Sequence, residues 1–75
     1  MTYRITTTSA SPPRRGAADE ASAKIVLMDT ILKVAAGNTV RIEHYCKTHS
    51  DPLLGAWHLF VTGSGYHIIE VEKTE

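Results

Sequence analysis

Four residues within eight positions of this chain carry side chains that bind metals or act as nucleophiles: His44, Cys46, His49 and Asp51. A structural zinc site needs four ligands in a tetrahedral array, usually supplied by closely spaced cysteine and histidine pairs. Cys46 is the only cysteine, and no such pair surrounds it. We therefore expect no metal and no cofactor. Metal binding or thiol-dependent chemistry through His44, Cys46 and His49 stays an alternative.

A nucleophilic site made of Cys46, His49 and Asp51 would need the imidazole within hydrogen-bond reach of the thiol, with an oxyanion hole beside it. These residues fall at the end of an expected strand and in a loop, and no glycine-rich turn precedes a helix to supply oxyanion donors. The glycine-containing segment 63–65 is no phosphate-binding loop either, because it lies between two expected strands. We expect a protein that is not an enzyme.

The composition is that of one small globular domain spanning residues 1–75. Apolar residues make up 43% and charged residues 21% of the chain, far from the profile of disordered proteins. Eight basic and eight acidic residues cancel, which argues against a nonspecific hold on nucleic acid. No apolar run is long enough for a signal peptide or a membrane span. Together with the lone cysteine, this predicts a cytoplasmic protein without a membrane partner.

One long amphipathic helix is expected after residue 16. Apolar residues recur there at alternating three- and four-residue steps, and Leu27, Ile31 and Val34 widen the stripe. The stripe itself consists of Ala18, Ala21, Ile25, Met28, Leu32 and Ala35. We expect this face to be buried. Acidic residues at 19 and 20 favour the start of a helix of about 20 residues, and Gly37 favours its end.

Side chains that alternate between two faces with a period of two residues predict strands at 2–8, 40–47, 56–62 and 66–72. The first strand is interpreted as an edge strand. The segment 9–16, with its prolines and with Arg14 and Arg15, is interpreted as a linker or a frayed helix start. The predicted fold class is therefore α+β, with one long amphipathic helix packed on a three- to four-stranded antiparallel sheet in the order β-α-β-β-β.

A three-residue hairpin loop at 63–65 would pair Thr62 with Tyr66. This register collects most of the large apolar side chains on the face toward the helix, namely Trp57, Leu59, Val61, Ile69 and Val71. The face turned away from the helix then carries Tyr45, Phe60, Tyr66 and Ile68, framed by Arg41, Glu43, His58 and Glu70.

Apolar patches rimmed by charge commonly mark protein interfaces, and tyrosine and arginine are enriched in interface cores. The eight residues of the outward face, Arg41, Glu43, Tyr45, His58, Phe60, Tyr66, Ile68 and Glu70, are therefore the candidate protein interface. An open alternative is that residues 9–16, or the loop 49–55 with its two leucines, fold over this face and leave no patch.

The favoured hypothesis is a small non-enzymatic protein-binding module, an inhibitor or adaptor that contacts another protein or protein complex, with a homodimer as a further option. Inhibitors encoded by phages and mobile elements, such as anti-CRISPR proteins, are one class of small binding protein to which this chain could belong, on grounds of size and fold class alone. The alternative is a module for single-stranded RNA or DNA, which would stack bases on the sheet aromatics and hold phosphates with Arg14 and Arg15. The element order and the charge balance weigh against nucleic acid.

Overall fold

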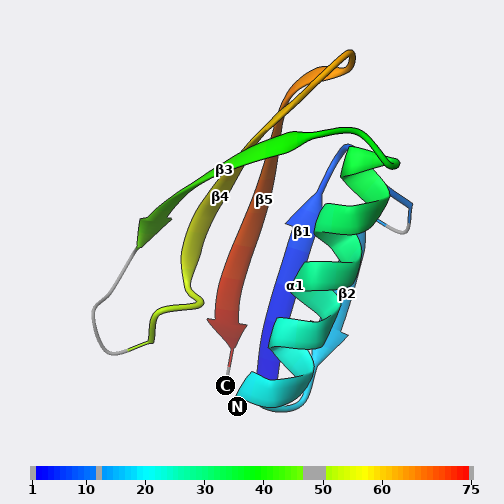
Figure 1. Ribbon diagram of the computed structural model, residues 1–75. Coiled ribbons are helices and arrows are strands. Elements are labelled where there is room, and N and C mark those ends of the chain that lie inside the picture. Colours follow the sequence, from blue (N-terminus) through cyan, green and yellow to red (C-terminus); the bar gives the residue numbers. More distant parts are fainter. Residues whose placement is uncertain (1, 12, 47–50, 75) are drawn as a thin grey trace.

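A computed structural model describes residues 2–11, 13–46 and 51–74. Its elements are β1 (Thr2–Thr7), β2 (Arg14–Ala17), α1 (Glu20–Ala35), β3 (Val40–Cys46), β4 (Gly55–Val61) and β5 (Gly65–Thr74). The strands form one antiparallel sheet in the order β2-β1-β5-β4-β3, with α1 across one face (Figure 1). The predicted α+β class is confirmed. The predicted strand count and element order are wrong, because the sheet has five strands and two of them precede the helix.

The segment 9–16, predicted as a linker, contains most of β2. This strand pairs with β1, so that Tyr3 lies opposite Ala17, and the Thr7 N–H donates to the Pro13 carbonyl at 2.8 Å. Because β1 also pairs with β5, it is an inner strand and not the predicted edge strand. The sequence of β2 contains no β-branched or aromatic residue, so local propensity gave no sign of it.

The helix is shorter than predicted because α1 starts only after its N-cap, Asp19. The Asp19 carboxylate accepts the Ser22 N–H at 2.8 Å. The helix ends at Ala36, which adopts the left-handed conformation (φ 51°) and donates its N–H to the Leu32 carbonyl at 3.0 Å. Gly37 follows with φ 84°, in agreement with the predicted stop.

Only part of the predicted apolar face of the helix is buried: Ala35 and the flanking residues Leu27, Ile31 and Val34 face the sheet, whereas the centre of the predicted stripe does not. Ile25, Met28 and Leu32 are 71%, 57% and 66% exposed. The residues buried against the sheet are Ala23, Leu27, Thr30, Ile31, Val34 and Ala35. Both stripes have helical spacing, so the hydrophobic pattern alone did not decide which one would face the sheet. α1 therefore carries a second apolar stripe on the side away from its own sheet.

The hairpin between β4 and β5 pairs Val61 with Gly65, whereas the predicted register pairs Thr62 with Tyr66. The Ser64 N–H donates to the Val61 carbonyl at 3.2 Å, which closes the turn one residue earlier than expected. The loop still has three residues, and the pairing slips by two positions. Since side chains alternate with a period of two, every residue keeps its predicted face.

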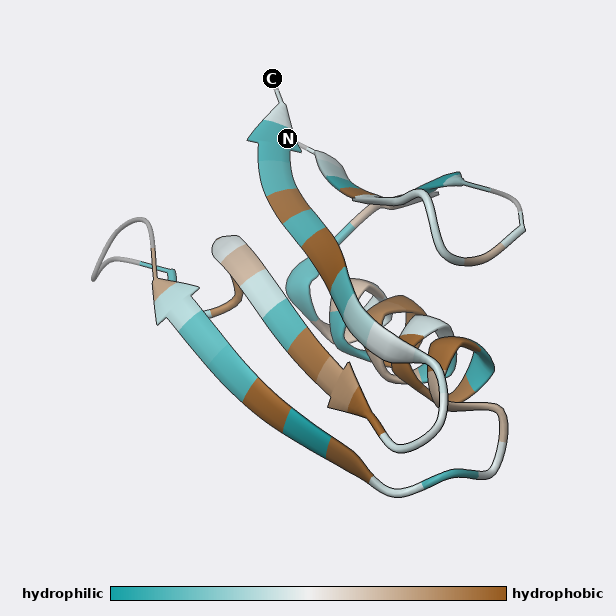
Figure 2. Ribbon diagram, turned by 90° about the horizontal axis from the view of Figure 1, so that it is seen from above, coloured by the Kyte–Doolittle hydropathy of each residue, from teal (hydrophilic) through white to brown (hydrophobic). Residues whose placement is uncertain are grey.

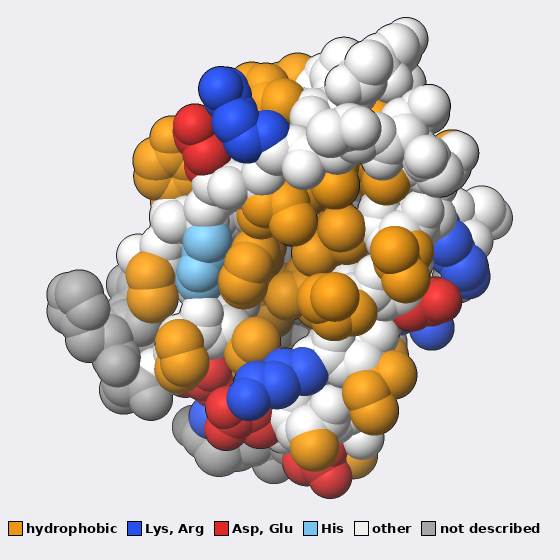
Figure 3. Space-filling view, viewed as in Figure 1, with side chains coloured by type: hydrophobic (Ala, Val, Ile, Leu, Met, Phe, Trp, Pro, Cys, Tyr) orange, Lys and Arg blue, Asp and Glu red, His pale blue; other side chains and the backbone are white. Residues whose placement is uncertain are grey.

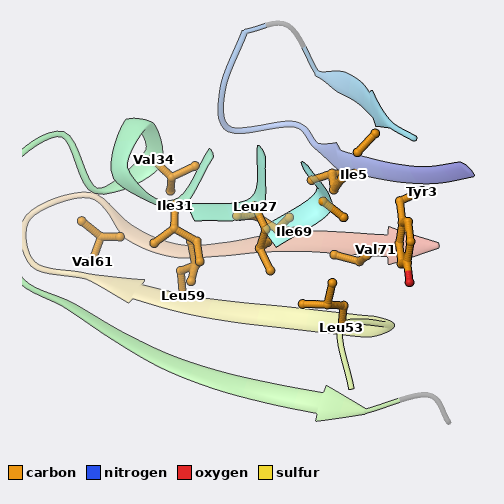
Figure 4. Close-up of a cluster of buried hydrophobic side chains, with 12 residues drawn as sticks. Tyr3, Ile5, Leu27, Ile31, Val34, Leu53, Leu59, Val61, Ile69 and Val71 are labelled. Carbon is orange, nitrogen blue, oxygen red and sulfur yellow. The ribbon is translucent and has the colours of Figure 1, made fainter. Parts of the chain in front are cut away.

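The hydrophobic core lies between α1 and the three central strands (Figure 4). Its most deeply buried side chains come from β1, β4 and β5, namely Ile5, Leu59, Ile69 and Val71. Leu27, Ile31 and Val34 cover them from the helix. Leu53, from the segment before β4, closes the end of the core beside Tyr3 and Val71.

Asp51 fixes that segment on the helix side of the sheet. Its carboxylate accepts the Tyr3 hydroxyl, the Leu53 N–H at 3.1 Å and the Lys73 ammonium group at 3.4 Å. Consequently, no described segment crosses the opposite side of β3, β4 and β5 (Figure 2). Within the described ranges, neither residues 9–16 nor the loop before β4 covers the outward face. No helix of the described chain has the length and hydropathy needed to cross a bilayer.

Candidate protein-binding face

The outer face of the sheet, on the side opposite α1, presents a grid of three cross-strand rows across β3, β4 and β5. Directly paired residues of neighbouring strands share a face, so the strand register defines each row. The upper row is Arg41, Phe60 and Tyr66, the middle row is Glu43, His58 and Ile68, and the lower row is Tyr45, Ala56 and Glu70. The structure thus brings all eight predicted interface residues together, with Ala56 as the ninth member.

The upper row is held by stacking. The guanidinium carbon of Arg41 lies 4.6 Å from the centre of the Phe60 ring, and the Phe60 and Tyr66 rings are 5.1 Å apart. A cation over an aromatic ring is attracted by its negative face. Arg41 also lies 3.8 Å from the Glu43 carboxylate. These contacts hold the long arginine side chain along the sheet.

His58, in the middle row, contacts side chains of both the upper and the lower row. The Tyr66 hydroxyl and the His58 Nδ1 are hydrogen-bonded, and the Tyr45 ring meets His58 edge-on at 4.6 Å. The Tyr45 hydroxyl donates to Glu43 Oε1 at 3.1 Å. This hydrogen bond to a carboxylate raises the pKa of Tyr45, because it favours the protonated phenol. Both tyrosine hydroxyls are engaged within the face, while about half of each tyrosine side chain stays exposed.

A hollow of about 270 Å³ opens at the lower row. It exists because Ala56 is small and stands between Tyr45 and Glu70, two much larger side chains. Glu72 adds a second carboxylate to its wall, and Arg4 pairs with that carboxylate at 2.6 Å. Sequence reasoning did not identify Ala56 and Glu72. The one available signal was the small Ala56 near the start of β4, just before a run of large side chains.

The two arginines proposed as a phosphate contact do not act together. Arg14 lies opposite Thr6 and shares its outward face, whereas Arg15 lies opposite Ile5 and points to the helix side. There Arg15 pairs with Asp29 of α1 at 2.5 Å, which lowers the pKa of that carboxyl. Both arginines also lie on β2, which β1 separates from the rows of the outer face on β5, β4 and β3.

The residues considered for metal or thiol chemistry have separate roles. His44 stacks on Trp57 with ring centres 3.7 Å apart, and its Nε2 is 3.1 Å from the Leu54 carbonyl oxygen. The Asp51 carboxylate belongs to the buried network with Tyr3, and Cys46, exposed at the end of β3, meets Asp51 only through its thiol, 4.0 Å from the Asp51 carbonyl oxygen. His49 lies outside the described residues. Among the described residues, no three histidine, cysteine or acidic side chains are grouped as metal ligands.

No family model, curated protein or solved structure matches this chain.

Proposed function

We propose that this protein is a non-catalytic binding module whose outer face docks on another protein. The observation that carries the proposal is the ordered and exposed aromatic grid. Tyr45, Tyr66 and Ile68 are large, exposed and on one side of the sheet, and His58 contacts both tyrosine rings between them. Tyrosine and arginine are the side chains that most often dominate binding energy at protein interfaces.

The contacts within the grid support binding because they hold the side chains in place before a partner arrives. Immobilising a flexible side chain at an interface costs about 0.5–1.5 kcal/mol. Arg41 is already stacked on Phe60, and both tyrosine hydroxyls already have hydrogen-bond partners. Binding therefore loses little side-chain entropy on this side of the interface.

The size of the grid indicates what else would take part. Three strands and three rows span roughly 15 Å in each direction. The area of the grid is therefore smaller than the ~800 Å² that a standard interface buries on each partner. The adjoining outward positions on β1 are polar, namely Thr2, Arg4 and Thr6. An apolar centre with a polar rim is the usual arrangement of such interfaces.

The hollow beside Ala56 defines the chemistry of one contact. It is lined by Tyr45, Glu70 and Glu72, and since Arg4 already pairs with Glu72, the Glu70 carboxylate is the one offered to a partner. A lysine or arginine of the partner would find there an aromatic surface for its stem and a carboxylate for its charge. We expect the partner to present a basic side chain at this point.

Site-specific photocrosslinking tests the proposal. A photoreactive phenylalanine analogue at Tyr66 should trap a partner from cells of the source organism, and the same analogue at Thr62, in the exposed hairpin loop, should not. The trapped protein is then purified and titrated against the wild type, Tyr66→Asp and the matched control Thr62→Asp. Loss of this exposed aromatic anchor should weaken binding ~30-fold or more, with the affinity of the Thr62→Asp control unchanged.

Circular dichroism should show that both aspartate variants remain folded, since both positions are exposed. Equal trapping at the two positions would contradict the proposal. So would equal affinity of the two variants for the trapped protein.

A further inference from the structure

The two edges of the sheet differ in how they are protected against pairing with another strand. An edge strand exposes a row of N–H and C=O groups, and proteins blunt such edges with short strands, proline, lysine or bulges. At one edge, β2 has only four residues, two of them arginines. At the other edge, β3 has seven residues, contains no proline or lysine, and pairs with β4 without a bulge. The edge of β3 therefore has none of these protecting features.

The hydrogen-bond pattern identifies which backbone groups of β3 point away from β4. The Thr62 N–H donates to the Thr39 carbonyl at 2.9 Å, so the backbone groups of Thr39 are directed toward β4. Successive residues of an antiparallel strand alternate in this respect. The even-numbered residues from 40 to 44 therefore direct their N–H and C=O groups to the free edge, namely Val40, Ile42 and His44. In the described part of the chain, these groups have no hydrogen-bond partner.

The charges on β3 select one register for pairing with a second copy of itself. A two-fold axis at Ile42 sets Arg41 opposite Glu43 of the second copy, twice over. An axis at Glu43 sets two carboxylates opposite each other, and an axis at Arg41 does the same with two guanidinium groups. An axis at His44 sets Glu43 opposite Tyr45. Because directly opposed residues of unlike charge stabilise an antiparallel pair and like charges destabilise it, charge favours the axis at Ile42.

We propose that this protein forms a two-fold symmetric dimer in which β3 pairs antiparallel with β3 of a second copy, centred on Ile42. The outward backbone groups then match, because Ile42 bonds to Ile42 and Val40 bonds to His44 across the axis, which gives roughly six backbone hydrogen bonds. Arg41 and Glu43 fall in the non-hydrogen-bonded pairs, where opposed side chains lie closest. The five-stranded sheet of each copy becomes half of one continuous sheet.

Burial of apolar surface favours the same pairing. Ile42 is 42% exposed, although it lies on the helix side of the sheet beside Val40 and Trp57, which pack against the core. Hydrophobic side chains continue across that side of the molecule from α1 toward β3 (Figure 3). Opposite its own copy, Ile42 gains an aliphatic cross-strand neighbour. The formal net charge of zero adds no long-range repulsion between copies.

The dimer would place the outer faces of both copies side by side. A two-fold axis perpendicular to the sheet keeps these faces on the same side of it. The two aromatic grids then form one surface about twice as wide as a single grid. The strand pairing itself does not depend on the proposed function, since it needs no other protein.

Sedimentation velocity of the purified protein tests the inference. One strand pair buries less area than a standard interface, so the dimer should be weak and concentrations from about 1 µM to about 1 mM are needed. The mass should rise from 8.2 kDa toward twice that value. Arg41→Glu and Glu43→Arg should each weaken association ~10-fold or more, because each sets like charges opposite each other. Glu70→Arg reverses a charge on the same face, two strands from the edge, and should dimerise like the wild type.

Mixing the two deficient variants gives the decisive result. Arg41→Glu carries two acidic residues at these positions and Glu43→Arg carries two basic ones, so every acid of the mixed dimer lies opposite a base. Association should therefore return on mixing, and also in the double variant that exchanges the two charges. Ile42→Pro removes an N–H that has no partner within one copy, and it should abolish the dimer while circular dichroism shows a folded monomer.

Three results would overturn the inference. A single 8.2 kDa species at every concentration would exclude the dimer. Loss of association in Glu70→Arg, or a dimer that survives Ile42→Pro, would place the contact elsewhere on the molecule. Loss of association in both charge variants without recovery on mixing would exclude the register centred on Ile42.

Discussion

Removal of the Asp51 carboxylate should destabilise the fold more than any other polar substitution considered above. Asp51 is 7% exposed and accepts hydrogen bonds from Tyr3, Leu53 and Lys73. Asp51→Ala deletes the acceptor and leaves the Tyr3 hydroxyl and the Leu53 N–H buried without it. An unpaired buried donor costs about 1–3 kcal/mol. The matched variant Asp51→Asn keeps the size and an acceptor oxygen but removes the charge.

The loss for Asp51→Ala should be about 2–3 kcal/mol, because relief from burying a charge offsets part of the two unpaired donors. A domain of this size has only about 3–5 kcal/mol of net stability. At ~4–8 °C per kcal/mol, the melting temperature should fall by roughly 10–20 °C. Asp51→Asn should lie between Asp51→Ala and the wild type.

The contribution of Asp51 to stability should also depend on pH. The Tyr3 hydroxyl, followed by the Leu53 N–H and the Lys73 ammonium group, lowers the pKa of Asp51 in the folded protein. A carboxyl with a lowered folded pKa stabilises the fold above its unfolded pKa of about 3.9 and loses that contribution as the pH falls through the folded value. The difference in free energy of unfolding between the wild type and Asp51→Asn should therefore be largest at neutral pH and become smaller in acid.

Urea denaturation followed by tryptophan fluorescence is the suitable assay. Trp57 is the only tryptophan, and its indole N–H donates to the Leu53 carbonyl at 3.1 Å, so it reports on the segment that Asp51 holds. Measurements belong at a protein concentration where the chain is monomeric. A change below about 0.5 kcal/mol for Asp51→Ala, within the range of ordinary surface substitutions, would refute the reasoning, as would a gap to Asp51→Asn that is independent of pH.

Three further substitutions test the orientation and the end of α1 by the same denaturation assay. Leu27→Ala should cost about 2–4 kcal/mol because it opens a cavity in the core, whereas Ile25→Ala should change stability by less than ~0.5 kcal/mol at an exposed site; equal losses would mean that the helix is turned differently. Ala36→Gly should stabilise the protein by about 0.5–1 kcal/mol, since Ala36 adopts the left-handed region that glycine enters without steric cost, and a loss of stability would contradict that conformation.

The outer face could be predicted because its geometry is local. β3, β4 and β5 follow one another in the chain and each pairs antiparallel with the next, so the alternation of side chains alone places Tyr45, Phe60 and Tyr66 on one side. Even the wrong hairpin register preserved this result, because the slip was by two positions. The hollow beside Ala56 could not be predicted, since it depends on which side chains flank a small residue across the strands.

The N-terminal half could be predicted only in part because its geometry depends on distant contacts. β2 forms by pairing with β1, and nothing in its own four residues favours a strand. The rotation of α1 places Leu27, Ile31 and Val34 in the core and leaves Asp29 on the flank that pairs with Arg15 of β2. Two apolar stripes with the same period leave that choice to tertiary structure.

The pairing of β1 with β5 has a mechanical consequence. Thr2 lies opposite Thr74, and their hydroxyls are 2.7 Å apart, so these two residues near the chain ends emerge side by side at one corner of the sheet (Figure 1). Tension applied between them would load the hydrogen bonds of this antiparallel pair one after another, beginning at that corner, because the bonds lie along the pulling direction. The domain should therefore yield to a small force. It would divide along its central seam, with β1, β2 and α1 on one side and the three-stranded meander that carries the aromatic face on the other.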